Sequence, residues 1–262
     1  MKLYIIKIGG NVIDNDLALQ KFLSDYASLN ANKILIHGGG KVATDISAGL
    51  GIEAKMVDGR RITDSETLKI VTMVYGGLIN KKIVANLQGL GSNAFGLTGA
   101  DGNAVKSNKR PVKNGVDYGF VGDVEKVDGQ LLQTLIKAGL KPVIAPLSHD
   151  GNGNMLNINA DTMASVTAVA MSQYFEVHLV YCFELKGVLE NFEDKNSVIS
   201  DISFEKYQAL KEKGIISKGM IPKMDNSFDA INAGVTSVRI CHADDLVSII
   251  NSGSKEGTTL RK

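Results

Sequence analysis

The sequence predicts an α/β protein in which helices cover both faces of a mainly parallel central sheet, a three-layer αβα sandwich. Two observations carry this prediction. Short runs are apolar at consecutive positions, as expected for strands that are covered on both faces. These runs alternate with helical patterns along the 262 residues, and repeated strand–helix–strand alternation is typical of parallel sheets.

The predicted elements follow in chain order. Strands are expected over residues 3–8, 33–37, 142–145, 177–181 and 237–241. Helices are expected over 17–28, 41–49, 64–87, 130–138, 161–171, 204–213 and 223–233. Thr63-x-x-Glu66 has the form of a capping box at the start of the third helix. Gly139 and Gly234 follow helix ends, where we expect them to act as left-handed caps.

Two stretches interrupt this alternation, residues 52–63 and 104–126, which are rich in Gly, Asp, Asn, Lys and Val. They predict hairpins that project from the sheet, with Asp58-Gly59 and Asn114-Gly115 as turns. A boundary near residues 173–176 would divide the chain into an N-terminal lobe, 1–175, and a C-terminal lobe, 176–262.

Composition is ordinary for a soluble globular protein, with 44% hydrophobic and 22% charged residues. A net charge of +1 gives no cationic excess for a nucleic acid partner. Every apolar run ends well short of the about 20 residues that a membrane helix needs, and Lys7 interrupts the first run, against a signal peptide. Cys182, Cys241 and four histidines form neither a disulfide framework nor a CxxC zinc site, which indicates a reducing cytoplasm.

Two glycine-rich turns carry the first chemical signal. Gly9-Gly10 and Gly38-Gly39-Gly40 each follow a strand and precede a helix. Ligands of open α/β sheets bind beyond the carboxyl ends of the strands, where glycine lets backbone amides approach an anion closely. Either turn alone has a structural alternative, a tight strand-to-helix connection. Together the turns favour contact with a phosphate group from two sides.

Lys7 is an ammonium in an apolar strand, where it is costly to bury unpaired. It would either reach an anion over the glycine turn or extend to water from an edge strand. Asn157 and Asn159 alternate as on a short strand, and Asp161 near the next helix start is either a helix cap or a functional acid. Lys223 stands at the start of a predicted helix, where the helix dipole disfavours a positive charge. Contact with an anion would explain this lysine, and a solvated lysine is the alternative.

Neither familiar nucleotide signature is complete. The P-loop pattern does not occur. Gly38-x-Gly40-x-x-Ala43 fits a dinucleotide fingerprint only in part, because the helix is short and Asp58 falls in a hairpin. An NAD-dependent oxidoreductase would depend on that spacing alone.

Six segments taken together, IIKIGGN, ILIHGGGK, DGRRIT, LNINAD, ELKGVL and GMIPKM, resemble the amino-acid kinase family over essentially the whole chain. The likeness is strongest to members that phosphorylate N-acetylglutamate in arginine biosynthesis. The resemblance implies the amino-acid kinase fold, an acylglutamate-binding and dimerising N-terminal lobe and an ATP-binding C-terminal lobe. It implies ATP as co-substrate, with Mg²⁺ held mainly by ATP phosphates and no metal ligands from the protein.

The resemblance also implies individual roles. Lys7 and Lys223 match two lysines that stabilise the transferring phosphoryl group, and Asp161 matches the aspartate that holds both. Substrate contacts are implied for Gly39, Gly40, Arg61, Asn157 and Asn159. Nucleotide contacts are implied for Gly9, Gly10, Glu184, Leu185, Lys186, Gly187, Val188, Leu189, Ile215, Ile216 and Ser217. Glu184 stands where the family usually has aspartate, and VYCFELKG is bulkier than the usual strand end.

The residue types suit this chemistry. A free carboxylate of pKa about 4 is already ionised at pH 7, so its phosphorylation needs no general base. Two anions must instead be brought together and their charge neutralised, for which two lysines and glycine amides are suited. Arg61 offers a planar fork to a substrate carboxylate, whereas its strand neighbour Arg60 is expected to face the other way.

Several alternatives remain open. N-acetyl is the default acyl group, but N-succinyl-glutamate or a carrier-linked aminoadipate would suit the same catalytic set. The basic hairpin over residues 106–115 would either accept an extra carboxylate or be a solvated charged hairpin. Carbamate, aspartate and uridylate kinases share the fold, although DGRRIT and LNINAD favour an acylglutamate. A catalytically silent amino-acid sensor is disfavoured because Lys7, Asp161 and Lys223 are all present.

The chain begins directly at its first strand, without the N-terminal helix that builds hexamers in arginine-sensitive members of the family. We therefore expect an enzyme that is insensitive to arginine. We also expect a homodimer formed through the long helix over residues 64–87, with a small molecule as the substrate and neither nucleic acid nor membrane as a partner.

Overall fold

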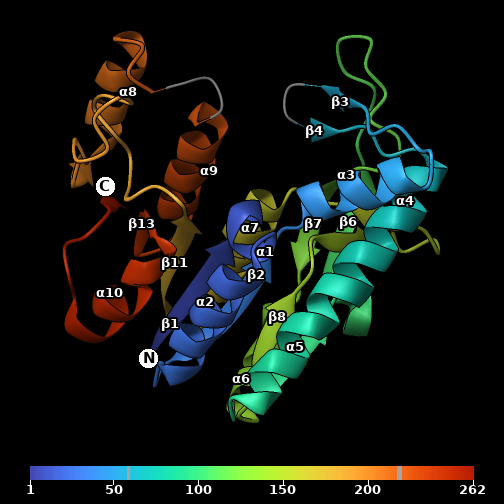
Figure 1. The fold of residues 1–262 in the computed structure, drawn as a ribbon, viewed down its shortest axis with the longest axis horizontal. Coiled ribbons are helices and arrows are strands. Elements are labelled where there is room, and N and C mark those ends of the chain that lie inside the picture. The colour runs from blue at the N-terminus through green and yellow to red at the C-terminus, as the bar shows by residue number, and fades with distance from the viewer. Residues whose placement is uncertain (58–59, 217–219) are drawn as a thin grey trace.

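The computed structural model describes residues 1–57, 60–216 and 220–262 (Figure 1). Within them, the main sheet has eight strands in the order β12-β14-β13-β11-β1-β2-β8-β5. All its neighbouring strands are parallel except β13 and β14. The strands are β1 Lys2–Ile8, β2 Asn32–His37, β5 Ala94–Leu97, β8 Lys141–Ile144, β11 Glu176–Phe183, β12 Asp201–Ile202, β13 Ser237–His242 and β14 Thr258–Leu260.

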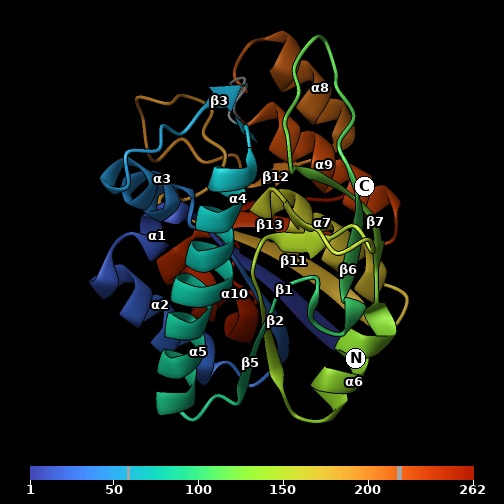
Figure 2. The same ribbon diagram turned by 90° about the vertical axis from the view of Figure 1, so that its right-hand side faces the viewer.

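Helices cover both faces of this sheet (Figures 1 and 2). Along β1, Leu3 and Ile5 face one core and Ile6 and Ile8 face the other, as the pleat of a strand requires. The first core is closed by α6 Gly129–Lys137, α7 Ala160–Met171, α8 Phe204–Glu212 and α9 Ile221–Asn232. The second is closed by α1 Gly10–Ile13, α2 Asp16–Ser28, α3 Gly40–Gly49, α4 Ser65–Val71, η1 Thr72–Ile79, α5 Asn80–Gly89 and α10 Leu246–Ser252. The predicted three-layer sandwich with a mainly parallel sheet is confirmed.

A second sheet has the strand order β10-β9-β6-β7. Its strands are β6 Val105–Lys109, β7 Gly122–Val127, β9 Leu147–His149 and β10 Met155–Asn157. The predicted hairpin is confirmed, since β6 and β7 are antiparallel and Asn114 and Gly115 both have positive φ, 51° and 74°. The other hairpin pairs β3 Met56–Val57 with β4 Arg60–Arg61, while its expected turn, Asp58-Gly59, lies outside the described residues.

The five predicted strands are confirmed as β1, β2, β8, β11 and β13, and all seven predicted helices are present. The helix expected over 64–87 is not one regular helix, because a π-helical segment, η1, separates α4 from α5. The capping-box prediction is wrong: Asp64, not Thr63, accepts the N–H of Thr67, at 2.8 Å. Gly139 and Gly234 have the positive φ expected of them, 81° and 110°.

Three strands of the main sheet end at one edge. Ile8 of β1 is in register with His37 of β2 and Cys182 of β11. The glycine turns after β1 and β2 therefore emerge beside Phe183, the last residue of β11. In the described parts of the chain, no helix has the length and apolar character needed to cross a membrane.

Candidate active site

Three charged side chains from distant parts of the chain meet at this edge. Lys7 Nζ lies 2.8 Å from Asp161 Oδ1, and Lys223 Nζ lies 3.4 Å from Asp161 Oδ2. Lys7 is on the face of β1 that carries Leu3 and Ile5, which packs against α7, and α7 in turn packs against α9. The side chains are 9%, 19% and 15% exposed for Lys7, Asp161 and Lys223. The elements β1, α7 and α9 thus each contribute one charged side chain to a largely buried cluster.

The cluster carries a net positive charge. Burial alone would raise the pKa of Asp161, but the ammonium groups of Lys7 and Lys223 outweigh burial and hold that pKa below its usual value. Burial lowers the pKa of Lys223, and Asp161 opposes this shift. The Lys7 contact lies outside hydrogen-bond geometry, so it is mainly an ion pair. Two ammonium groups on one carboxylate leave one positive charge for an anion.

Phe183 is a member of this cluster that sequence reasoning did not single out. Lys223 Nζ lies 3.6 Å from the centroid of its ring and Lys7 Nζ lies 5.2 Å from it. A β-carbon on Gly9 would lie 3.3 Å from the same ring. The bulky strand end in VYCFELKG was the available signal, but bulk alone did not indicate a cation–π contact.

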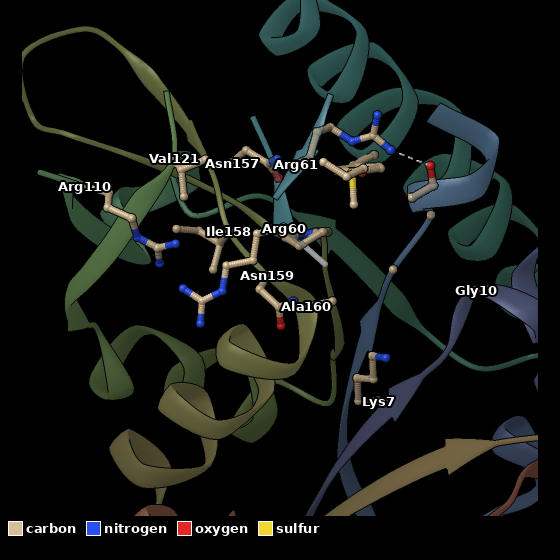
Figure 3. Close-up of a pocket in the computed structure, with 16 residues that line it drawn as sticks. Lys7, Gly10, Arg60, Arg61, Arg110, Val121, Asn157, Ile158, Asn159 and Ala160 are labelled. Atoms are coloured by element: carbon tan, nitrogen blue, oxygen red, sulfur yellow. Dashed lines mark hydrogen bonds between the residues drawn. The ribbon is translucent and has the colours of Figure 1, made fainter. Parts of the chain in front are cut away.

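The two glycine turns border the same pocket (Figure 3). Gly39 has φ of 145°, and a β-carbon there would lie 2.2 Å from Ile79 Cδ1, so only glycine fits. Gly40 begins α3 and Gly10 begins α1. Gly9 donates its N–H to Cys182 O at 3.2 Å, so that amide is already engaged. Gly10, Gly39 and Gly40 line the pocket, as does Tyr75 of η1, which nothing in the helical pattern had distinguished.

The pocket has a volume of about 240 Å³. It is lined by Lys7, Gly10, Gly38, Gly39, Gly40, Met56, Arg60, Arg61, Tyr75, Arg110, Val121, Pro146, Asn157, Ile158, Asn159 and Ala160. All five residues expected to contact the substrate are therefore brought together with Lys7. Arg60 also borders the pocket, although it is exposed whereas Arg61 is buried.

Arg61 is held by the first turn of α3. Its Nη2 donates to Gly40 O at 2.8 Å and to Thr44 Oγ1 at 2.7 Å, and Figure 3 shows this side chain turned toward α3. Its Nη1 is buried and has no hydrogen-bond partner in residues 1–57, 60–216 and 220–262. A buried guanidinium with a free donor is suited to receive a carboxylate.

The two asparagines differ from their expected arrangement. Asn157 ends β10 and donates to Thr63 Oγ1 at 3.1 Å. Asn159 is not on the strand but is the N-cap of α7, where its Oδ1 accepts the N–H groups of Asp161 and Thr162. Asp161 is therefore not the cap of this helix, and its carboxylate is directed to the two lysines.

The described residues of the expected nucleotide stretches do not line the pocket. Glu184 and Lys186 are exposed, and Leu185 and Ile215 are half-buried. Gly187, Val188, Leu189 and Ile216 are buried, and Val188 donates its N–H to Thr258 Oγ1 at 2.8 Å. Val188 and Ile216 belong to the apolar core. Ser217 lies outside the described residues.

Comparison with known proteins places this site in a family context. Residues 2–242 match the family model described as the amino acid kinase family. The chain is 68% identical over 259 residues to acetylglutamate kinase of Cytophaga hutchinsonii, covering 99% of this chain and 98% of the relative. It is 58% identical over 261 residues to acetylglutamate kinase of Bacteroides thetaiotaomicron, covering 100% and 99%.

Solved structures show the same fold at lower identity. N-acetylglutamate synthase from Neisseria gonorrhoeae, complexed with coenzyme A and N-acetyl-glutamate, has a TM-score of 0.86 at 21% identity, over 99% of this chain and 59% of that one. Carbamate kinase from Giardia lamblia bound to AMP-PNP has a TM-score of 0.73 at 15% identity, over 100% and 98%. With the family match spanning residues 2–242, the chain belongs to the amino acid kinase family.

Proposed function

We propose that this chain transfers the γ-phosphoryl group of ATP to the side-chain carboxylate of N-acetyl-L-glutamate, forming an acyl phosphate in arginine biosynthesis. Relatives at 68% and 58% identity over nearly the whole chain carry the name acetylglutamate kinase. The observation that carries the proposal is the Lys7–Asp161–Lys223 cluster beside a pocket lined by glycines and arginines.

The proposed reaction needs positioning and charge neutralisation. A substrate carboxylate oxygen attacks the γ-phosphorus in line, and the bond to the β,γ-bridging oxygen breaks as ADP leaves. The carboxylate is ionised at pH 7, so no residue has to remove a proton. Lys7 and Lys223 neutralise the charge on the transferring group, and Asp161 keeps both ammonium groups in place. The amides of Gly10, Gly39 and Gly40 are donors for the phosphoryl and carboxylate oxygens.

Arg61 is proposed to bind the other carboxylate of the substrate through its free Nη1. Its Nη2 is fixed on α3, so the guanidinium is already oriented before the substrate arrives. Asn157 and Asn159 border the same pocket. The Asn159 side chain already caps α7, so we propose that it contacts the substrate while it keeps the helix start, and with it Asp161, in position.

Mg²⁺ is proposed to enter with ATP, held mainly by the phosphate oxygens. The carboxylate of the site, Asp161, is occupied by two ammonium groups, which makes it a poor cation ligand. When bound, Mg²⁺ supplies further positive charge to the phosphates. We further propose that residues 184–189 and 215–217 contact the nucleotide and that residues 176–262 form the ATP-binding lobe. The position of Lys223 within residues 176–262 supports this proposal.

A homodimer in the cytoplasm is also proposed. Four large apolar side chains are exposed along η1, the end of α5 and the edge strand β5: Met73, Leu78, Leu90 and Phe95, at 58%, 53%, 46% and 41%. Exposed apolar side chains on and beside an edge strand are suited to contact a second copy of the chain. Cys182 and Cys241 are buried free thiols, which supports a reducing compartment.

The experiment that tests the function measures ADP release with N-acetyl-L-glutamate for the wild type, Lys7→Ala and Lys223→Ala. We expect turnover by the wild type and losses of about 10²-fold or more in each variant, as for the removal of one transition-state contact. Lys41→Ala is the matched control, because Lys41 is an exposed lysine directly after the Gly38-Gly39-Gly40 turn. Near-normal turnover by either active-site variant would contradict the mechanism, and an inactive wild type would favour a silent sensor.

One observation makes N-succinyl-L-glutamate a second candidate substrate. Arg60 and Arg110 border the pocket in addition to Arg61, and N-succinyl-L-glutamate has one carboxylate more than the acetyl compound. Arg110 already pairs with Asp123, at 2.6 Å, which reduces its free charge. We therefore expect a higher kcat/KM for N-acetyl-L-glutamate. A kcat/KM at least tenfold higher for the succinyl compound, lost in Arg110→Ala, would assign the succinyl substrate instead.

A further inference from the structure

A buried hydrogen-bond chain runs from α5 to the glycine turn that follows β2. His37, the last residue of β2, is fully buried, and its Nδ1 lies 2.8 Å from Gly38 O. Its Nε2 lies 3.2 Å from Nδ2 of Asn80, the first residue of α5, which is also fully buried. The same Asn80 nitrogen donates to Val143 O of β8 at 3.0 Å. The turn is thereby connected to a helix and a neighbouring strand.

The partners of the imidazole determine its tautomer. Lys81 Nζ lies 3.1 Å from Asn80 Oδ1, and because an ammonium only donates, the amide oxygen faces Lys81 and the amide nitrogen faces His37. Nε2 therefore accepts a hydrogen bond. The Gly38 carbonyl can only accept, so Nδ1 carries the proton. Burial lowers the pKa of His37 to about 4, which keeps the ring neutral at physiological pH.

The position of the Gly38 carbonyl determines where the next amide points. The Gly38–Gly39 peptide is trans, so its C=O and N–H point in opposite directions. Because the carbonyl is held against the buried ring, the N–H of Gly39 points away from that ring, and Gly38, Gly39 and Gly40 all line the pocket. A β-carbon added to Gly39 would lie 2.2 Å from Ile79 Cδ1 and 3.2 Å from Tyr75 Cδ1, so these side chains pack closely against the turn.

We propose that His37 is a positioning residue for phosphoryl transfer: its Nδ1–H holds the Gly38 carbonyl so that the Gly39 N–H faces the transferring group. This inference rests on the proposed function, because it assigns a task to a turn of that site. His37 touches no substrate and acts only through the turn. Neutral and fully buried, it is neither an acid, a base nor a ligand in the reaction.

Two isosteric substitutions separate this role from simple packing. An asparagine amide nitrogen can occupy the place of imidazole Nδ1, and a glutamine amide can occupy the place of Nε2. His37→Asn therefore keeps the donor to Gly38, whereas His37→Gln keeps the Asn80 contact and loses that donor. We expect kcat to fall about tenfold or more in His37→Gln, with KM for N-acetyl-L-glutamate changed less than about threefold. His37→Asn should recover most of kcat.

Equal losses in both variants, or full activity in both, would overturn the proposal. His178→Gln is the control, because His178 is a half-buried histidine near the opposite end of β11. Urea unfolding midpoints show whether a loss of activity is a loss of folding. Should His37→Gln fail to fold, ¹⁵N NMR of histidine-labelled wild type decides: protonated Nδ1 with unprotonated Nε2 supports the proposal, and the opposite tautomer overturns it. The NMR spectrum reports the tautomer independently of activity. If the wild type releases no ADP, that result refutes the proposed function, and the spectrum still tests the contact between His37 and Gly38.

Discussion

Phe183 shows how one side chain can hold two like charges close together. The centroid of its ring lies 3.6 Å from Lys223 Nζ and 5.2 Å from Lys7 Nζ, so one ring contacts both ammonium groups that pair with Asp161. The ring face is attractive to cations, and cation–π contacts contribute about 0.5–1 kcal/mol at exposed sites and about 2 kcal/mol when desolvated. We infer that Phe183 helps to keep both ammonium groups directed at the phosphoryl group.

Replacing the ring should therefore cost activity without unfolding the protein. Phe183→Leu keeps an apolar side chain but removes the π face, and we expect kcat/KM to fall about 3- to 30-fold. Phe183→Tyr should retain most of the activity. The measurement is steady-state ADP release, with Phe192→Leu as a control because Phe192 is a phenylalanine that is 75% exposed. Wild-type kinetics in Phe183→Leu would show that the contact is incidental.

At this scale, the sequence revealed the residues whose chemistry conflicts with their surroundings. Lys7 was noticeable because an ammonium interrupts an apolar strand. The Gly38-Gly39-Gly40 turn was noticeable because consecutive glycines let the backbone approach a ligand closely. His37, Tyr75 and Phe183 stayed unnoticed, since each fits the apolar pattern around it. Their roles depend on partners that are distant in sequence, such as Asn80, which no local spacing indicates.

Among the elements, the segment over residues 64–87 shows what a periodic pattern cannot predict. Its helical character was clear, but the π-helical register of η1 was not, because it arises from packing. Widened helical turns are frequent at functional sites, and this one presents Tyr75 and Ile79 to Gly39. The Thr63 cap failed for a similar reason: the Thr63 hydroxyl is engaged by Asn157, which leaves Asp64 to cap the helix.

The contact between η1 and the glycine turn can be tested by removing single atoms. Gly39→Ala should lower the free energy of unfolding by about 1–3 kcal/mol, through the positive φ and the clash with Ile79 Cδ1. Ile79→Val deletes that atom and alone costs about 0.5–1.5 kcal/mol. The double variant should be more stable than additivity predicts, because the clash is absent.

Urea unfolding of the four proteins in this cycle gives the coupling energy. Gly40→Ala is the matched control, since a β-carbon at Gly40 would meet nothing within 4 Å. It should leave the free energy of unfolding within about 0.5 kcal/mol of the wild-type value. Strict additivity of Gly39→Ala and Ile79→Val would mean that backbone strain alone, and not the packing of η1, requires glycine at this position.

For the whole molecule, the eight-stranded sheet ends on one side at β5, and α5 packs beside that strand (Figure 2). Phe95 on β5 and Met73 and Leu78 on η1 are exposed apolar side chains, and we refer to these proposed contacts for a second copy of the chain as the apolar patch. Because η1 also packs on Gly39, a partner seated on this patch would support the wall of the active site. Dimerisation and activity are therefore expected to depend on each other.

Sedimentation velocity should show a dimer for the wild type and a monomer for Leu78→Glu, since a buried carboxylate without a partner is costly at an apolar interface. The matched control is Leu17→Glu, at a leucine of α2 that is 79% exposed and lies outside the patch. The Leu78→Glu monomer should keep its secondary structure but lose part of its kcat, because η1 then lacks its outer support. A wild-type monomer at micromolar concentration would refute the dimer, and a fully active monomer would refute only its link to the active site.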